Sequence, residues 1–405
     1  MGNIRSLKCR ECGKEYDPQF RYVCEECFGP LDVLYKDVKV DRKTFELREK
    51  TYWRYFELLP IADKKNIVSL NAGLTPLQLA DKLGTSLGLK SLYVKNDSVN
   101  PTFSFKDRPA GVAVSRAKET GLKAVGCAST GNLASATAAH AAKAGLPCYI
   151  FAPSDLEHVK IAQALSYGAQ FVAVEGTYDD ANRVASIIGD SKGIGVVNIN
   201  MRPYYVEGSK TLAYEVAEQL DWKIPDNLII PVGSGAMLNA ICKGFEELHS
   251  LGLIDSPKEM RIIAAQPHGC APVVDAFKRN SDEIIPIEHP ETIAKSLAIG
   301  DPGDGMYVLK RLKQYNGIAE EANDAEICDS ILLLARTEGI FTEPAGGVAV
   351  AVLRKLVEEG KIDKDESTVC YVTGNGLKTT EAIIGLLPKL TAVKPDAALV
   401  AAMIR

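Results

Sequence analysis

The sequence lacks any hydrophobic run long enough to cross a membrane. Its longest wholly apolar stretch, Ala397 to Ile404, has eight residues, whereas a membrane-spanning helix needs about 20. The first 30 residues also lack the apolar core of a secretory signal peptide. We therefore expect no membrane partner and a cytoplasmic location.

An excess of basic residues is also missing. The chain has 47 lysines and arginines against 52 aspartates and glutamates, a formal net charge of −5. This balance argues against a nucleic-acid partner held by a basic face. Of the 405 residues, 46% are hydrophobic and 24% are charged, which is typical of a globular chain and argues against extensive disorder. The length predicts two or three domains.

The cysteines do not have the pattern of a disulfide framework. Four of the ten stand in the first 27 residues, and the other six are scattered singly through apolar or helical stretches. A cysteine in such a stretch typically packs as a small hydrophobe. Unpaired cysteines without a signal peptide indicate a reducing compartment. The six scattered cysteines are Cys127, Cys148, Cys242, Cys270, Cys328 and Cys370.

The four N-terminal cysteines form two Cys-x-x-Cys pairs with 11 residues between them. This spacing favours a tetrahedral zinc site with a structural role, although thiolate sites also accept iron. Disulfides and a redox motif are less favoured, because a redox motif stands at a strand-to-helix junction. The segment carries more acidic than basic residues, so a nucleic-acid-binding ribbon is not indicated. The predicted metal ligands are Cys9, Cys12, Cys24 and Cys27.

From about residue 74 onward, short β-branched runs alternate with helical stretches. The β-branched runs include Ala124–Cys127, Gln170–Val174 and Asn227–Val232. The helical stretches between such runs include 132–144, 207–220, 235–249, 324–338 and 346–360. This alternation predicts parallel sheets with helices on both faces, and ligands then bind at the carboxyl ends of the strands. We predict four segments: a zinc-ribbon-like knuckle (1–36), a connecting arm with a helix (37–73), a catalytic body (74–390, with a smaller α/β domain at about 110–210) and a C-terminal arm (391–405).

Lys106 is the most informative single residue. It stands in the segment Asn100-Pro101-Thr102-Phe103-Ser104-Phe105-Lys106-Asp107-Arg108, just before a predicted helix. A lysine in such a place can form a Schiff base with a carbonyl cofactor. On this motif alone, a surface lysine at a helix start remains an alternative.

Three further loops follow predicted strands. Ser129-Thr130-Gly131-Asn132 precedes a helix, where backbone N–H groups favour an anion such as a carboxylate. Gly233-Ser234-Gly235-Ala236-Met237 also opens a helix and suits a phosphate, but it lacks the third glycine of a dinucleotide fingerprint. Thr373, in Val372-Thr373-Gly374-Asn375-Gly376, could face a heterocycle nitrogen. Each loop alone is ambiguous.

Together and in this order, the motifs resemble the fold type II family of pyridoxal 5′-phosphate enzymes, the tryptophan-synthase-β-like group, and within it the threonine synthases. The resemblance covers about 70 to 385. It implies an α/β fold of two open parallel-sheet domains, here preceded by the zinc-ribbon-like segment, and a homodimer. Two departures are modest: Phe103 stands where glycine or histidine is often found, and Asn375 where some members have histidine or aspartate. The motifs are NPTFSFKDR, ASTGN, NINMRPYYVEGSKT and TGNGLKT.

The resemblance implies a role for each motif. Lys106 would bind the cofactor as a Schiff base and move protons, Asn132 would bind its phenolic oxygen, and Thr373 would meet its pyridine nitrogen. The cofactor phosphate would lie on Gly233, Ser234, Gly235, Ala236 and Met237. The substrate carboxylate would lie on Ser129, Thr130 and Asn132, and the candidates for the substrate phosphate are Arg202, Asn200 and Lys210.

The reaction implied is the conversion of O-phospho-L-homoserine and water into L-threonine and phosphate. Two alternatives stay open. One is a related enzyme, a threonine or serine dehydratase or a cysteine or cysteate synthase, although these usually carry serine or cysteine in the loop that holds Thr373. The other is a zinc-ribbon regulator without catalysis, which the retained Lys106 disfavours.

Overall fold

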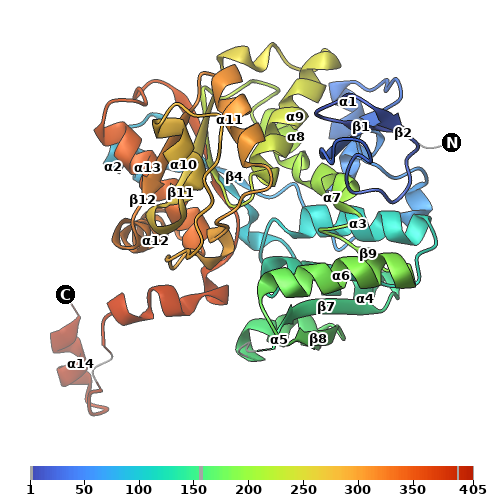
Figure 1. The fold of residues 1–405 in the computed structure, drawn as a ribbon. Helices are drawn as coiled ribbons and strands as arrows, with labels where there is room; N and C mark the ends of the chain where they lie inside the picture. The colour runs from blue at the N-terminus through green and yellow to red at the C-terminus, as the bar shows by residue number, and fades with distance from the viewer. Residues whose placement is uncertain (1–2, 155–157, 390–391, 405) are drawn as a thin grey trace.

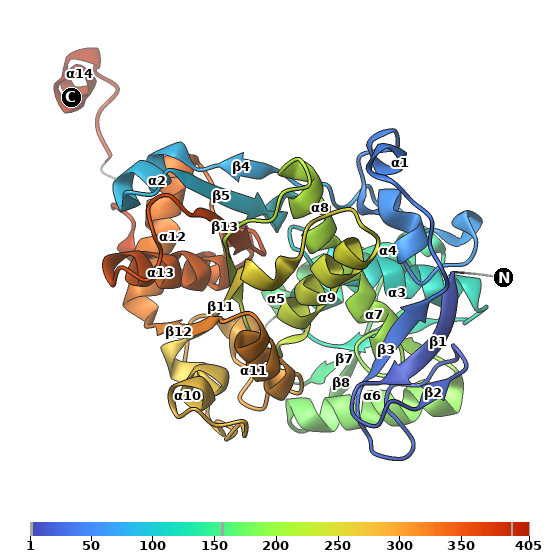
Figure 2. The ribbon, with the colours of Figure 1, turned by 90° about the horizontal axis from the view of Figure 1, so that it is seen from above.

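The computed structural model describes residues 3–154, 158–389 and 392–404. Two α/β lobes lie side by side, and the N-terminal strands pack over the junction between them (Figures 1 and 2). Each lobe is built on its own sheet, so the fold has two parallel-sheet layers as predicted. Residues 1, 2, 155–157, 390, 391 and 405 of the predicted segments lie outside the described residues.

The larger lobe contains a six-stranded sheet in the order β12-β11-β10-β13-β5-β4. All neighbouring strands are parallel except β4, which pairs antiparallel with β5 at one edge. The central strands are almost wholly buried because helices cover both faces. The strands are β4 (Leu77–Leu79), β5 (Ser91–Asn96), β10 (Asn227–Pro231), β11 (Arg261–Pro267), β12 (Ile318–Ala322) and β13 (Ser367–Val372).

Two hydrophobic clusters cover the two faces of this sheet. One is formed with α8, α9, α10 and α11, and the other with α2, α12 and α13. The predicted alternation of strands and helices therefore produces a buried parallel sheet. The bounds are α2 (Asp81–Leu87), α8 (Thr211–Gln219), α9 (Ala236–Ser250), α10 (Pro272–Lys278), α11 (Gly305–Gln314), α12 (Asp324–Glu338) and α13 (Pro344–Glu358).

The smaller lobe contains a four-stranded parallel sheet in the order β8-β7-β6-β9. The chain enters this lobe after β5 and leaves it before β10. Its strands are β6 (Val125–Ala128), β7 (Cys148–Pro153), β8 (Gln170–Val174) and β9 (Gly195–Val196), and its helices are α3 (Asp107–Glu119), α4 (Asn132–Ala144), α5 (His158–Ser166), α6 (Tyr178–Lys192) and α7 (Arg202–Ser209).

The N-terminal region forms a small antiparallel sheet in the order β2-β1-β3, and its apolar side chains pack against Tyr204 of α7. The chain then continues through α1 and two 3-10 helices, η1 and η2. Aromatic residues of η1 are buried; Tyr52 and Tyr55 have no exposed surface, so this stretch belongs to the packed body. The bounds are β1 (Ile4–Cys9), β2 (Glu15–Tyr16), β3 (Leu31–Tyr35), α1 (Arg42–Glu46), η1 (Tyr52–Leu58) and η2 (Lys64–Asn66).

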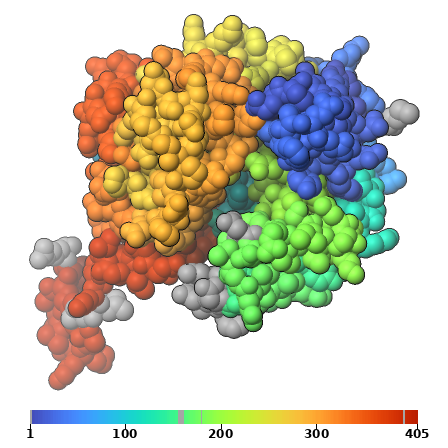
Figure 3. All heavy atoms as spheres, viewed as in Figure 1, coloured from blue at the N-terminus to red at the C-terminus, as the bar shows by residue number. Residues whose placement is uncertain are grey.

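The C-terminal helix α14 (Ala397–Met403) stands away from both lobes (Figures 1 and 3). Its apolar side chains are exposed, including Leu399 and Met403. Among the described residues, no helix is both long enough and apolar enough to cross a membrane.

Candidate active site

Lys106 lies at the start of α3, between the two lobes. Its Nζ atom donates a hydrogen bond to the Tyr205 hydroxyl on α7 at 3.0 Å. The ammonium also lies 4.7 Å from the ring centre of Phe105 and 5.6 Å from that of Tyr205. The side chain is half-buried. Aromatic rings and a hydroxyl therefore surround the amine, and a carbonyl group can reach it.

The loop that carries Lys106 is fastened to the end of β13. The Phe105 N–H donates to the Thr373 carbonyl at 2.9 Å, and the Asn375 N–H donates to the Phe103 carbonyl at 3.0 Å. The Lys378 ammonium donates to the Thr102 carbonyl at 2.9 Å. These bonds bring the predicted lysine loop and the predicted threonine loop together at the carboxyl edge of the larger sheet.

Glu343, which precedes α13, bridges two of the predicted cofactor ligands. Its carboxylate accepts a hydrogen bond from the Asn132 Nδ2 atom at 2.9 Å and another from the Thr373 hydroxyl at 3.4 Å. The side chain is buried, and burial raises its pKa although Asn132, Lys378, Thr373 and Lys106 each act to lower it. Gly374 leaves room for this carboxylate, because a Cβ atom there would collide with it.

Ser129 and Thr130 lie half-exposed at the end of β6, before the N-terminus of α4. No side chain caps α4, so the free N–H groups of its first turn are available to an anion. The end of β6 is held by Asn198, whose side chain accepts from the Ala128 N–H at 3.2 Å and donates to the Ala128 carbonyl at 3.3 Å. This arrangement suits a substrate carboxylate.

The glycine loop 233–237 follows β10 and opens the 15-residue helix α9. Gly235 has a φ of +90°, and a Cβ there would lie 2.7 Å from Val308, so only glycine fits this turn. The N-cap residue Gly235 offers no side chain to α9, and the Ala236 N–H donates to the Ser234 hydroxyl at 3.4 Å. Because β10, β13 and β5 are adjacent parallel strands, this loop, Thr373 and the Lys106 loop all lie at one edge of the sheet. The loop therefore presents a second helix N-terminus to an anion.

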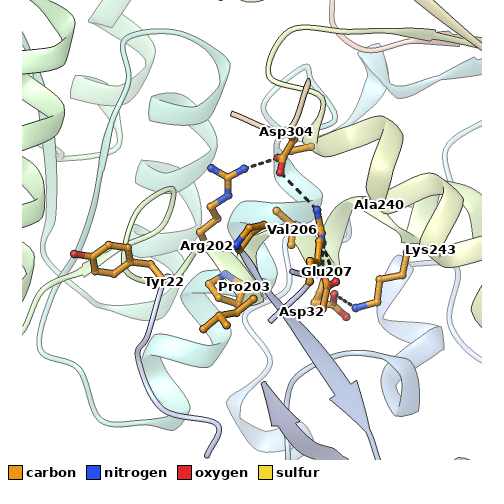
Figure 4. Close-up of a pocket in the computed structure, with 13 residues that line it drawn as sticks. Tyr22, Asp32, Arg202, Pro203, Val206, Glu207, Ala240, Lys243 and Asp304 are labelled. Carbon is orange, nitrogen blue, oxygen red and sulfur yellow. Dashed lines mark hydrogen bonds and ion pairs between the residues drawn. The ribbon is translucent and has the colours of Figure 1, made fainter. Parts of the chain in front are cut away.

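The structure separates the three candidates for the substrate phosphate. Arg202 is partly exposed and forms an ion pair with Asp304, which adjoins the glycine loop (Figure 4). Asn200 is turned toward β9: its side chain accepts from the Val196 N–H at 2.8 Å and donates to the Ile194 carbonyl at 3.0 Å.

Lys210 is not brought to this site. Its ammonium is fully buried and pairs with Glu207 at 2.6 Å and Glu247 at 2.8 Å. It also lies 4.2 Å from the ring centre of Tyr35. Two carboxylates already neutralise this lysine, so its place in the fold is that of a buried ion pair between α7 and α9.

These features fit pyridoxal phosphate. The Lys106 amine has a hydroxyl partner and no carboxylate partner among the described contacts, and two uncapped helix N-termini face the same region as the lysine loop. Asn132 and Thr373 supply polar side chains in between. A phosphate, a carboxylate and a carbonyl-bearing ring therefore each find a matching group.

The four N-terminal sulfurs fit a metal ion equally well. All four lie within 4.8 Å of one another, with 3.4 Å between the sulfurs of Cys9 and Cys27 and 3.6 Å between those of Cys12 and Cys24. Four sulfurs bound tetrahedrally to zinc at about 2.3 Å stand about 3.8 Å apart. Gly29 allows this approach, because a Cβ there would lie 2.9 Å from the Cys9 sulfur.

Sequence reasoning missed Glu343, Tyr205 and Lys378 at this site. Tyr205 and Lys378 stand inside motifs that the sequence singles out, but nothing in their spacing separates them from neighbouring residues. Glu343 had one signal: an acidic residue directly before a proline at a helix start, a few residues from the predicted helix 346–360.

Comparison with known proteins agrees with this geometry. Residues 68–374 match the model of a family described as pyridoxal-phosphate dependent enzyme. The chain therefore belongs to the family of pyridoxal-phosphate dependent enzymes. Its relatives include proteins named threonine synthase from Methanocaldococcus jannaschii, with 44% identity over 93% of this chain and 94% of the relative, and from Methanosarcina acetivorans, with 40% identity over 96% and 95%.

Solved structures match the fold alone. The processed form of threonine deaminase isoform 2 from Solanum lycopersicum superposes with a TM-score of 0.64 at 24% identity, and the match covers 78% of this chain and 84% of that one. The predicted fold class, with two α/β parallel-sheet lobes, is thus confirmed.

Proposed function

We propose that this chain is a threonine synthase, a lyase that converts O-phospho-L-homoserine and water into L-threonine and phosphate. The observation that carries this proposal is the likeness to proteins of that name, at 44% and 40% identity, over nearly the whole of both chains. The amine of Lys106 at the junction of the lobes supports it, because the reaction needs a lysine there.

Bound pyridoxal phosphate supplies an electron sink for negative charge that develops on the substrate carbons. The N–H groups at the start of α9 would hold its phosphate, and Asn132 and Thr373, which lie on either side of the Glu343 carboxylate, would hold its ring. Lys106 then holds and moves protons at the substrate α and β carbons. The Tyr205 hydroxyl, 3.0 Å from the Lys106 amine, orients that amine.

The substrate carries two anionic groups. Ser129, Thr130 and the open N-terminus of α4 bind the carboxylate, with Asn132 beside it. Arg202 binds the phosphate, since its planar guanidinium can donate two parallel hydrogen bonds to it. Asp304 holds Arg202 in place before the substrate arrives.

An assay of phosphate release from O-phospho-L-homoserine, run beside O-phosphoserine, tests the proposal. We expect release from the first compound, L-threonine as product, and a visible absorption band of the bound cofactor. Lys106→Ala should abolish activity and that band, whereas Lys143→Ala, an exposed lysine at the far end of α4, should preserve both. Activity in Lys106→Ala would contradict the proposal.

The same assay separates the alternatives. A dehydratase would release ammonia from threonine or serine and leave phosphohomoserine intact. A cysteine or cysteate synthase would require a sulfur nucleophile in place of water. A regulator without catalysis would show no cofactor band in any preparation.

The remaining assignments concern metal, assembly and location. One zinc ion per chain on Cys9, Cys12, Cys24 and Cys27 is supported by the sulfur spacing, and metal analysis would identify zinc or iron. A homodimer is supported by the exposed apolar side chains near the C-terminus, such as Ile384 and Leu399. A cytoplasmic location is supported by the free cysteines. Sedimentation of the purified chain measures the oligomeric state.

A further inference from the structure

Arg10 and Glu11, the two residues between Cys9 and Cys12, contact the catalytic body. The Arg10 guanidinium lies 3.6 Å from the Asp304 carboxylate and 5.1 Å from the ring centre of Tyr307. The Glu11 carboxylate accepts a hydrogen bond from the Tyr307 hydroxyl at 2.6 Å and lies 3.3 Å from the Lys310 ammonium. The knuckle therefore contacts the first two turns of α11 and the residue before it.

Asp304 also contacts the glycine loop. Its N–H donates to the Ser234 carbonyl at 3.0 Å, and its carbonyl accepts from the Asn239 side chain at 3.3 Å. A Cβ on Gly235 would lie 3.0 Å from that carbonyl oxygen. The backbone of Asp304 thus fixes the turn that opens α9.

Arg10 is itself held firmly by the ribbon. It donates two parallel hydrogen bonds to Asp32, at 2.8 and 2.7 Å, and its N–H donates to the Pro30 carbonyl at 3.0 Å. Arg10 and Asp304 both line a narrow crevice between the ribbon and the body. Figure 4 labels Asp304 there, beside Arg202. The Asp304 side chain is only 4% exposed, and its carboxylate pairs with both Arg10 and Arg202.

We propose that Arg10 is a positioning residue for the cofactor-phosphate loop, and that the metal-closed knuckle holds it there. The inference rests on the proposed assignment of residues 233–237 to the cofactor phosphate. A chain of contacts leads from the Cys9–Cys12 knuckle through Arg10 and Asp304 to Ser234. The ribbon, which offers no open coordination position for chemistry, thereby acts on cofactor affinity.

Titration of the apoprotein with pyridoxal phosphate tests this proposal. Arg10→Ala should weaken cofactor binding by about tenfold, which corresponds to about 1.4 kcal/mol, and should change the 31P chemical shift of the bound phosphate. Arg10→Lys should restore part of the affinity, because the charge that faces Asp304 is kept. The matched control is Arg5→Ala, since Arg5 pairs with Glu15 inside the ribbon at 3.2 Å.

Two further measurements make the test independent of the folding of one variant. Tyr307→Phe removes the Glu11 hydrogen bond and should weaken cofactor binding by about two- to threefold. Removal of the metal with a chelator should weaken cofactor binding by the wild type. It should cause little further weakening in Arg10→Ala, because both changes release the same contact. Thermal unfolding of each variant shows whether it is folded.

The outcomes are distinct from those of the proposed function. Wild-type protein that binds no cofactor would overturn the proposed function itself. Wild-type protein that binds the cofactor, with unchanged affinity and an unchanged phosphorus signal in Arg10→Ala and Tyr307→Phe, would overturn this inference alone. Equal weakening in Arg5→Ala would also overturn it, because the effect would then belong to the ribbon's general stability.

Discussion

The Glu343 carboxylate accepts a hydrogen bond from the Asn132 side chain at 2.9 Å. Asn132 begins α4 in the smaller lobe, and Glu343 precedes α13 in the larger lobe. The same carboxylate accepts from Thr373 at 3.4 Å. One buried acidic group therefore joins the two lobes at the place proposed for the cofactor ring.

Replacement of Glu343 by glutamine should change how stability depends on pH. Burial raises the pKa of Glu343 above its ordinary value of 4.5, so the folded protein favours the protonated form. The contribution of Glu343 to the free energy of unfolding is then largest below pH 4.5, and it decreases as the pH rises toward the folded-state pKa. Each tenfold change in the acid dissociation constant on folding corresponds to about 1.4 kcal/mol of unfolding free energy.

We therefore expect Glu343→Gln to be at least as stable as the wild type at pH 7, with the difference vanishing toward pH 4.5. Chemical denaturation at several pH values measures this. Glu359→Gln is the control, since Glu359 stands exposed at the end of the same helix. A variant that loses stability at pH 7 would show that the ionised carboxylate is needed.

Replacement of Arg202 by lysine should separate its ion pair with Asp304 from its proposed contact with the substrate phosphate. The lysine ammonium can still pair with Asp304, but it cannot donate the two parallel hydrogen bonds of a guanidinium. We expect the KM for O-phospho-L-homoserine to rise by about tenfold or more, while cofactor affinity stays within about twofold. Steady-state kinetics and cofactor titration measure the two effects.

The control for this substitution is Arg261→Lys. Arg261 forms a comparable ion pair with Glu366, at 2.6 Å, but at the opposite end of the strands. It should leave both constants unchanged. Loss of cofactor from Arg202→Lys would place Arg202 with the glycine loop rather than with the substrate.

Glu215 should contribute acid-sensitive stability. Burial by itself would raise its pKa, but Arg108 and Lys95 lower it from 4.5 to about 2. The Lys95 ammonium lies 2.7 Å away, and none of these three side chains is exposed. Because the folded-state pKa is lowered, the stabilisation is complete above pH 4.5 and is lost as the pH falls toward 2.

Glu215→Gln should lose about 3–5 kcal/mol of unfolding free energy at pH 7, because it leaves two buried cations with less negative charge. The difference from the wild type should shrink between pH 4.5 and 2. Glu366→Gln, which breaks a partly exposed pair, should cost less than about 1 kcal/mol. Equal losses of unfolding free energy in Glu215→Gln and Glu366→Gln would contradict the stabilising role of the buried Glu215 ion pairs.

Phe103 adopts a backbone conformation that suits glycine. Its φ is +66° and its side chain is 48% exposed, and glycine adopts this left-handed region without steric cost. A left-handed conformation costs a non-glycine residue roughly 1–2 kcal/mol. Glycine removes this cost, but its greater entropy in the unfolded chain offsets about 0.5–1 kcal/mol of the gain in stability.

Phe103→Gly should therefore raise stability by up to about 1 kcal/mol. Val99→Gly is the matched control, because Val99 is exposed but has no positive φ, and it should lower stability. Thermal melting of the two variants measures the difference. A loss of stability in Phe103→Gly would mean that the exposed ring contributes more packing than its strain costs.

Much of the fold was predictable because its signals are local. The helix 132–144, the helix 324–338 and the strand Gln170–Val174 have their expected bounds, since each is delimited by glycine, asparagine or a change of hydrophobic period. The four cysteines also gather as their spacing predicts, because two short knuckles leave the sulfurs few other positions.

Other elements gave no such signal. Strand β12 has the sequence Ile-Ala-Glu-Glu-Ala, which lacks the pattern of a strand. The sheet accommodates its glutamates because β12 lies at the edge, where they pair with Lys278. The helix expected at 207–220 begins at Arg202 and is divided at Lys210. Gly208 packs against the backbone of Arg108 there, a contact set by the fold.

The site was predictable only in part for the same reason. Lys106 and Thr373 stand in motifs that become specific only when taken together, and the links between these motifs depend on tertiary contacts. The sequence makes Lys210 a candidate for the substrate phosphate, yet it is enclosed by Glu207 and Glu247. The Glu343–Asn132 and Arg10–Asp304 contacts each join segments far apart in the sequence, so only the tertiary fold reveals them.

The place of β13 in the sheet has a consequence for synthesis on the ribosome. This strand lies between β5 and β10, yet β5 begins at Ser91 and β13 only at Ser367. At roughly 5–20 residues per second, β5 waits on the order of tens of seconds with only the short strand β4 as its neighbour. The nascent chain thus exposes an apolar strand edge until β13 has been synthesised, and the strand that precedes Thr373 then covers it.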